Sequence, residues 1–166
     1  MRSLILWGVI CLSFMLLSAC APAPEPEPEA AAEAVFDQAA EEEAIRKVIQ
    51  EGISAHNNHD AKGVVVFLDE VYENLDGSRK GPGAFEETYA EQFNRAKDLK
   101  YQELQYVRTV FVTPDVAIYK SVGEFSGQVD EDGNNLPPSK VTRIHLVVKR
   151  NGNWLRAARF NIPIEE

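Results

Sequence analysis

The stretch that decides the fold is residues 141–164, VTRIHLVVKRNGNWLRAARFNIPI. Two strand-like runs flank Asn151-Gly152, a dipeptide that strongly favours a two-residue β-hairpin turn. We therefore predict that residues 141–150 and 153–164 pair as antiparallel strands, with Arg150 opposite Asn153.

The pairing of this hairpin predicts which side chains share a face, because opposed residues of paired strands point the same way. If the register continues without interruption, one face is apolar near the turn and carries Arg159, Asn161 and Thr142 at its far end. Such a pattern is typical of a core strand pair whose far end lines a pocket. An arginine there would suit a carboxylate or another planar anion, held by two hydrogen bonds.

The opposite assignment of the two faces stays open. Trp154 falls on the second face, which mixes basic and apolar residues, although tryptophan prefers burial. If the faces are reversed, Arg143 and His145 line the pocket instead.

Upstream of the hairpin, the sequence predicts two more strands. Apolar residues alternate over residues 101–113, Pro114-Asp115 marks a tight turn, and residues 116–126 continue as the next strand. Before them come elements of helical pattern. Apolar residues at three- and four-residue spacing predict helices over residues 36–55 and 84–96, and Asp60 can cap a short helix between them.

Helices followed by long antiparallel strands make an α+β pattern. The order of elements resembles the nuclear-transport-factor-2-like superfamily, and the SnoaL-like branch in particular. The motifs that carry the resemblance are Asn58-His59-Asp60, Asp76-Gly77 with Gly81 downstream, Gly152-Asn153-Trp154 and the last strand, Phe160 to Ile164. It covers residues 40–164 and implies a cone-shaped, cystatin-like fold. In that fold the N-terminal helices pack on a curved antiparallel sheet, and a pocket lies at the mouth of the cone.

The N-terminus indicates export. Arg2 precedes an almost wholly apolar run, and Leu17-Ser18-Ala19-Cys20 resembles the lipobox of bacterial lipoproteins. The resemblance implies that residues 1–19 are a signal peptide and that the new N-terminal Cys20 carries lipid, palmitate included, which anchors the protein to a membrane. Ala21 is compatible with the outer membrane of a Gram-negative envelope, facing the periplasm.

Residues 20–38 form the expected tether, and residues 39–166 the folded domain. The tether is rich in Ala, Pro and Glu, which favours extended polyproline II geometry. With Cys11 removed in the signal peptide, Cys20 is the only remaining cysteine, so we expect no disulfide.

Charge and motifs exclude several classes of function. Lys and Arg number 17 against 26 Asp and Glu, a formal net charge of −9, which argues against nucleic acid as a partner. His56 and His59 end a helix, where imidazole is favourable anyway, and the acidic loop at 130–135 lacks the glutamate of a calcium loop. We expect no metal site and no cofactor, because motifs for phosphate loops, paired cysteines or a nucleophile elbow are missing.

Candidate catalytic groups are few. Asp69, Glu73 and His145 are the side chains that could act as a general base, but none lies in a distinctive motif. Tyr72 and Glu73 alternate on an extended segment, so Tyr72 joins the pocket and Glu73 is solvated if the tyrosine points inward.

Three functions of different classes remain, since this type of fold supports all of them. A tethered domain that binds a small organic ligand, anionic if Arg159 contacts it, ranks first. A structural or interaction protein that forms a homodimer or docks through its sheet ranks second. An isomerase-, hydrolase- or cyclase-like enzyme ranks third, because no catalytic constellation stands out.

Overall fold

The computed structural model describes residues 36–72 and 80–165. The predicted signal peptide, Cys20, most of the tether, Glu73 and the Asp76-Gly77 turn lie outside the described residues. None of the helices within the described ranges is long and apolar enough to cross a membrane.

Three helices precede the sheet. Helix α1 spans Gln38–Asn57, α2 spans Ala61–Val65 and α3 spans Gly81–Arg95. Asp37 caps α1, since its carboxylate accepts hydrogen bonds from two backbone N–H groups of the first turn, each at 3.1 Å. The buried stripe of α1 consists of Ile45, Ile49, Gly52 and His56.

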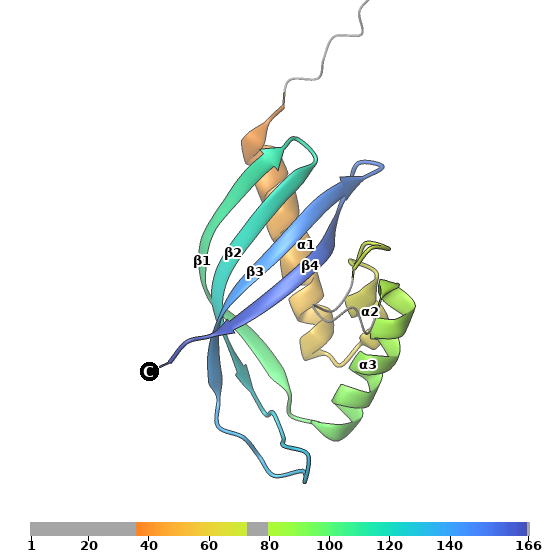
Figure 1. The fold of residues 1–166 in the computed structure, drawn as a ribbon, viewed down its shortest axis with the longest axis vertical. Helices are drawn as coiled ribbons and strands as arrows, with labels where there is room; N and C mark the ends of the chain where they lie inside the picture. Colours follow the sequence, from red (N-terminus) through yellow and green to blue (C-terminus); the bar gives the residue numbers. More distant parts are fainter. Residues whose placement is uncertain (1–35, 73–79, 166) are drawn as a thin grey trace, which may run out of the picture. The chain divides into compact units, whose positions relative to one another are not determined.

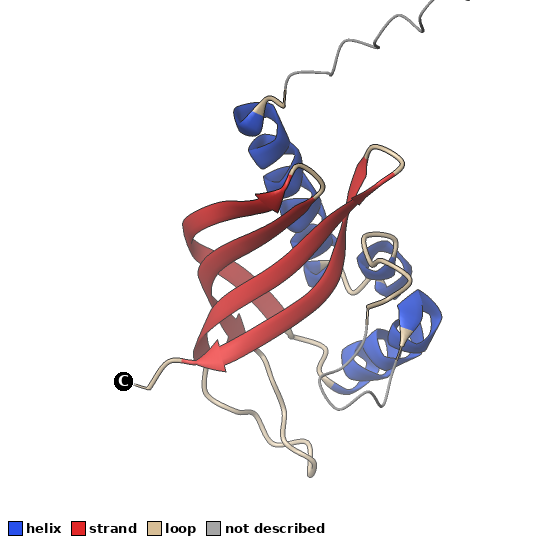
Figure 2. Ribbon diagram, turned by 45° about the horizontal axis from the view of Figure 1, so that its top comes forward, coloured by secondary structure: helices blue, strands red, loops and turns tan. Residues whose placement is uncertain are grey.

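Four antiparallel strands follow in the order in which they occur in the chain. Strand β1 spans Lys100–Thr113, β2 Val116–Ser126, β3 Ser139–Arg150 and β4 Asn153–Pro163, and the sheet order is β1-β2-β3-β4. Figures 1 and 2 show the long, curved sheet with α1 crossing behind it and α2 and α3 beside its β4 side. The predicted α+β architecture is confirmed, with helices packed on a curved antiparallel sheet.

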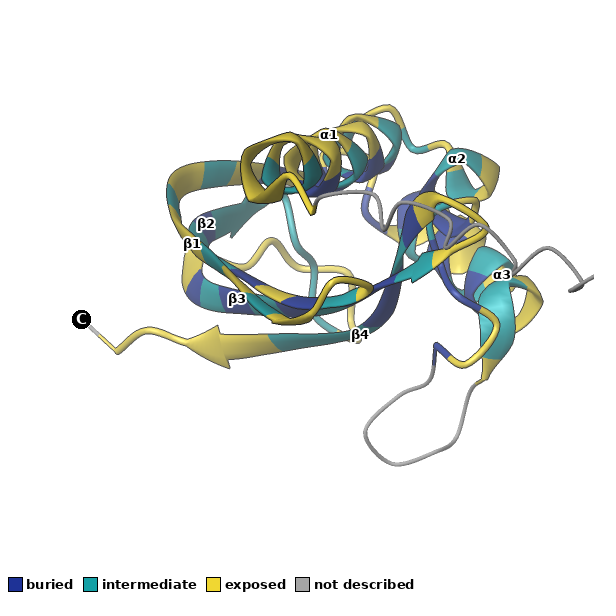
Figure 3. Cartoon of the chain, turned by 90° about the horizontal axis from the view of Figure 1, so that it is seen from above, coloured by how far each residue is buried: buried dark blue, intermediate teal, exposed yellow. Residues whose placement is uncertain are grey.

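The helices occupy one face of the sheet, which we call the inner face. Figure 3 shows α1 lying over this face, while none of the described helices covers the opposite, outer face. Two apolar clusters fill the inner side. One contains Tyr72, Phe85, Tyr89 and Phe93 between α2 and α3, and the other contains Ile45, Ile49 and Trp154 between α1 and the sheet.

A β-bulge in β4 corrects the register that the sequence predicts. Arg150 pairs with Asn153 and Val147 with Arg156, as an Asn151-Gly152 turn requires. Beyond Arg156 the register shifts, so that Leu146 pairs with Ala158 and not with Ala157. The expectation of uninterrupted pairing is therefore wrong. A bulge adds one residue to one strand, which reverses the face on which every later side chain lies.

The bulge brings residues from both predicted sets to the inner face. Trp154 and Arg156 point inward before it, and Arg159 and Asn161 point inward after it, opposite His145 and Arg143. Thr142 is the correction: it alternates with the buried Arg143 and so lies on the outer face, paired with Val122 and Ile162.

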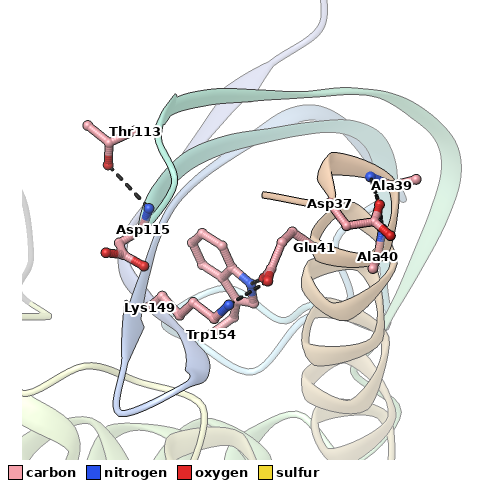
Figure 4. A network of polar contacts seen from close by, with 8 residues as sticks. All are labelled: Asp37, Ala39, Ala40, Glu41, Thr113, Asp115, Lys149 and Trp154. Carbon is pink, nitrogen blue, oxygen red and sulfur yellow. Dashed lines mark hydrogen bonds and ion pairs between the residues drawn. The ribbon is translucent and has the colours of Figure 1, made fainter. Parts of the chain in front are cut away.

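Trp154 also lies on the inner face, contrary to the first assignment of faces, and its contacts explain its burial. Its indole N–H donates to Glu41 at 2.7 Å, and Lys149 donates to the other oxygen of the same carboxylate. Figure 4 shows Glu41 reaching from the first turns of α1 to both side chains. This bridge fixes the N-terminal half of α1 on the sheet.

Replacing Glu41 with glutamine is expected to lower the free energy of unfolding by about 1–2 kcal/mol at pH 7, because charge-assisted hydrogen bonds are lost. The hydrogen bonds from Lys149 and Trp154 lower the pKa of Glu41 below 4.5. Its contribution is therefore present above pH 4.5 and is lost as the pH falls through the lowered pKa. Urea unfolding at several pH values measures both effects. The exposed Glu43 on the same helix is the control, and equal losses in the two variants would contradict the bridge.

Candidate functional site

A small polar cavity lies on the inner face, between the two apolar clusters. Its walls include Arg143, Arg156 and Arg159 from the sheet and two histidines, His56 of α1 and His145 of β3. The space open to the centre of a water molecule is about 10 Å³, which is room for about one water. No Asp or Glu is among the described residues that line it.

Arg143 is buried against aromatic rings. Its guanidinium carbon lies 3.3 Å from the centre of the Tyr101 ring and 5.0 Å from that of Phe125. Its Nε donates to the side-chain oxygen of Asn161 at 3.1 Å. Burial, with the nearby charge of Arg159, lowers the pKa of Arg143 to about 9, so the side chain still carries its charge at neutral pH.

Arg156 is held against α1 and α2. Its side chain is 4% exposed, and one terminal nitrogen donates to the carbonyl of Val64 at 2.7 Å. The absence of a side chain at Gly52 leaves room for this guanidinium, since a Cβ there would lie 3.3 Å from the guanidinium carbon. Burial lowers the pKa of Arg156.

Arg159 completes the cluster from beyond the bulge. Its guanidinium donates to the hydroxyl of Tyr89 at 3.1 Å. Burial alone would raise the pKa of this tyrosine, but the charges of Arg159 and Arg156 bring it below its usual value.

The three guanidinium charges have no counter-ion among the described residues. The described ion pairs of acidic side chains involve other bases, such as Glu41 with Lys149 and Asp69 with Arg150. A buried charge without a partner costs several kcal/mol. An anion in the cavity would offset this cost.

The cavity also gathers buried polar atoms that have no hydrogen-bond partner. Six such side-chain atoms occur in the described residues, and five of them belong to the cavity wall: His56 Nδ1, the Tyr101 hydroxyl, both ring nitrogens of His145 and Arg156 Nε. Buried polar groups are nearly always paired in folded proteins. Their concentration around one space indicates that a polar ligand or ordered water belongs there.

Both cavity histidines are neutral at pH 7. Burial, then the charge of Arg159, lowers the pKa of His56 to about 4. Burial, then Arg143, lowers the pKa of His145 well below its usual value. A neutral imidazole offers one N–H donor and one acceptor.

Only some of the ligand-binding residues predicted from the sequence lie at the cavity. Arg159 lies in the cavity wall and Asn161 behind it, on Arg143. Tyr72 is buried but packs on Phe85, with ring centres 4.7 Å apart, and is not among the residues that line the cavity. Thr142 lies on the outer face, as described above.

The described candidates for a general base, Asp69 and His145, lie in different parts of the structure. The Asp69 carboxylate accepts from Arg150 at 3.0 Å and from the backbone of Val71 at 3.0 Å, at an open groove on another part of the surface. His145 is the only one of the described candidates within the cavity, and its lowered pKa makes it a poor base. Sequence reasoning did not identify His56, whose position in the buried stripe of α1 was the available signal. No group of three or more metal-binding side chains occurs in the described residues.

Comparison with known proteins identifies the fold. No protein-family model and no curated protein matches the sequence. Among solved structures, an uncharacterised protein with a cystatin-like fold from Caulobacter vibrioides is 19% identical with a TM-score of 0.65, covering 74% of this chain and 89% of its own. A ketosteroid isomerase-like protein from Erwinia carotovora atroseptica is 19% identical with a TM-score of 0.60, covering 76% and 98%.

A third structure is of a nuclear-transport-factor-2-like protein of unknown function from Shewanella oneidensis, 14% identical with a TM-score of 0.53, covering 72% of this chain and 97% of its own. At these identities the similarity is one of fold. The chain therefore has the cystatin-like fold of nuclear-transport-factor-2-like proteins, as its sequence motifs implied.

Proposed function

We propose that this domain binds a small organic anion with a planar oxyanion group, such as a carboxylate, in the cavity between α1 and the sheet. The observation that carries the proposal is the set of three inward-facing arginines without a described acidic partner, surrounded by five unpaired polar atoms. Arginine presents a rigid, planar fork of N–H donors that matches a carboxylate.

The neighbouring groups complete such a site chemically. The ring of Tyr101 packs against the guanidinium of Arg143. One of the two unpaired ring nitrogens of neutral His145 can donate its N–H to an oxyanion. The cavity has room for about one water and a carboxylate has three heavy atoms, so the wall must open to admit the anion.

We further propose that the domain acts while tethered to a membrane of the cell envelope through lipid on Cys20. The support is the lipobox-like Leu17-Ser18-Ala19-Cys20 and the Pro/Glu tether that follows. Mass spectrometry of the N-terminal peptide from the native host tests this. Diacylglyceryl-modified Cys20 is expected, and an unmodified N-terminus at another residue would contradict the anchor.

A ligand that survives gentle purification should be visible by native mass spectrometry. We expect a mass above that of the protein alone, which is lost in Arg159→Gln because the guanidinium that contacts the anion is removed. Arg108→Gln, an exposed arginine on β1, is the control and should keep the adduct. A ligand-free mass that stays ligand-free after incubation with acetate and other carboxylates would contradict the proposal.

A homodimer through the outer face of the sheet is the second candidate, because this face is apolar. Val110, Ile118, Leu146 and Ala158 form one row across all four strands, and Ile118 and Ile162 are 38% and 50% exposed. An exposed apolar patch of this kind marks interaction surfaces.

Replacing Ile118 with lysine should therefore convert a dimer into a monomer in light scattering, since the change buries a charge in the interface. Val66→Lys, at an exposed apolar position at the end of α2 and away from the outer face of the sheet, should leave the mass unchanged. A wild-type protein that stays monomeric at high concentration would rule out this candidate and leave anion binding unaffected.

A further inference from the structure

We propose that His56 and His145 are ligand-binding residues that take up a proton together with the anion. This inference rests on the proposed function, since it concerns the same cavity. It names a property that anion binding alone does not require: the site binds the anion and a proton as a pair.

The first support is the geometry of His145. The residue is 1% exposed, lies in the cavity wall and has no partner for either ring nitrogen. Its β4 neighbour is Arg159, so an anion held by that guanidinium lies next to the imidazole. A protonated imidazole would donate from both nitrogens, one of them to the anion.

The second support is the charge around His145 in the empty site. From β3 and β4 it faces Arg143, Arg156 and Arg159. From β2 the ring of Tyr119 lies 6.1 Å away, and this hydroxyl donates to Glu103 of β1 at 2.8 Å. The cations therefore dominate, and the empty cavity keeps the imidazole neutral.

His56 faces similar surroundings from α1. The charges that act on it are those of Arg159 and Arg143, with His59 in the turn that follows α1. On α3, Tyr89 and Phe93 present ring edges to it, with centroids 6.3 Å and 5.2 Å away, and Tyr101 of β1 lines the same cavity. Its Nδ1 is buried without a partner. No described carboxylate faces either histidine.

An anion in the cavity reverses this balance. An opposite charge within about 4–6 Å favours the protonated form of a histidine by roughly tenfold to a thousandfold. The anion therefore raises the pKa of His56, which is about 4 in the empty site. Because the pKa is higher in the bound state, binding is tighter at low pH. Affinity is expected to rise by about tenfold from pH 7 to pH 5 and to level off above pH 7.

The experiment uses nitrate, which is planar like a carboxylate and stays fully ionised over this range, so that any proton taken up is on the protein. Ring resonances of all three histidines are followed by NMR from pH 3 to 8, with and without saturating nitrate, and nitrate affinity is measured across the same range. We expect the midpoint of His56, His145 or both to move up by at least one pH unit when nitrate is bound. His59, whose Nε2 contacts the Leu99 carbonyl at 2.9 Å, should not move by this amount.

Variants separate the two proposals. The double variant His56→Gln/His145→Asn is expected to bind nitrate with nearly constant affinity, and His59→Gln to keep the tenfold pH dependence. Nitrate binding that requires Arg159 but leaves every histidine midpoint and the affinity unchanged would overturn proton uptake and leave the proposed function standing. Absence of nitrate and acetate binding at any pH would overturn both. The NMR comparison needs only the wild-type protein, so it holds even if the double variant does not fold.

Discussion

Replacing Arg143 with methionine is expected to raise the free energy of unfolding of the ligand-free protein by about 1–3 kcal/mol. The guanidinium is 4% exposed and has no described acidic partner, and burial already lowers its pKa to about 9. Methionine fills a similar volume between Tyr101 and Phe125 without a charge, and Asn161, which is exposed, can turn its oxygen to water. The same variant should bind acetate and nitrate at least tenfold more weakly.

The opposite sign is expected for the same substitution seven residues along the strand. Arg150 pairs with the buried Asp69, so Arg150→Met leaves a carboxylate without its partner and should lower the free energy of unfolding by about 1–2 kcal/mol. Urea unfolding of both variants without added anion measures the contrast. A loss of stability in Arg143→Met as large as that in Arg150→Met would show that Arg143 is a structural residue and not a binding residue kept at a cost to stability.

Gly123→Ala is expected to produce the largest loss of stability, about 3 kcal/mol. A Cβ at this position on β2 would lie 2.1 Å from the Tyr101 hydroxyl and 2.7 Å from the backbone oxygen of Gln102. Tyr101 is 1% exposed and lies beneath Arg143, so it has little room to move. The clash should also displace Arg143 and weaken anion binding.

Gly83→Ala is the matched control, because a Cβ there meets nothing within 4 Å. The residue lies in the first turn of α3, and alanine favours a helix by up to about 1 kcal/mol over glycine. Urea unfolding should therefore show no loss in this variant. A loss of less than about 1 kcal/mol in Gly123→Ala would mean that the space around Tyr101 is looser than the structure has it.

Much of the fold follows from local patterns in the sequence. Asn151-Gly152 has the backbone required of its turn, with positive φ at both residues, and the pairing of Arg150 with Asn153 follows directly. Helix α1 and the strands can likewise be predicted locally, from the spacing of their apolar residues. The resemblance of several short motifs then gives the right fold, although no family model matches the chain.

The site could be predicted only in part, because it depends on one non-local feature. The bulge after Arg156 leaves no signal in the alternation of apolar residues: Ala157 and Ala158 fit either face. Without the bulge, Arg159 and Arg143 lie on opposite faces, so the sequence presents them as alternatives. With it, the two guanidinium groups share one cavity. His56 was missed because a histidine near the end of a helix has an ordinary explanation in the helix dipole.

Whether the arginine cluster holds an anion can be seen in a crystal of the purified protein soaked in sodium bromide. Bromide is a monatomic anion, smaller than a carboxylate or nitrate, so it requires the least displacement of the cavity wall, and it identifies itself by anomalous scattering. We predict a strong anomalous peak within hydrogen-bonding distance of Arg143, Arg156 and Arg159. Bromide peaks confined to the protein surface, with the cavity holding none, would contradict the account.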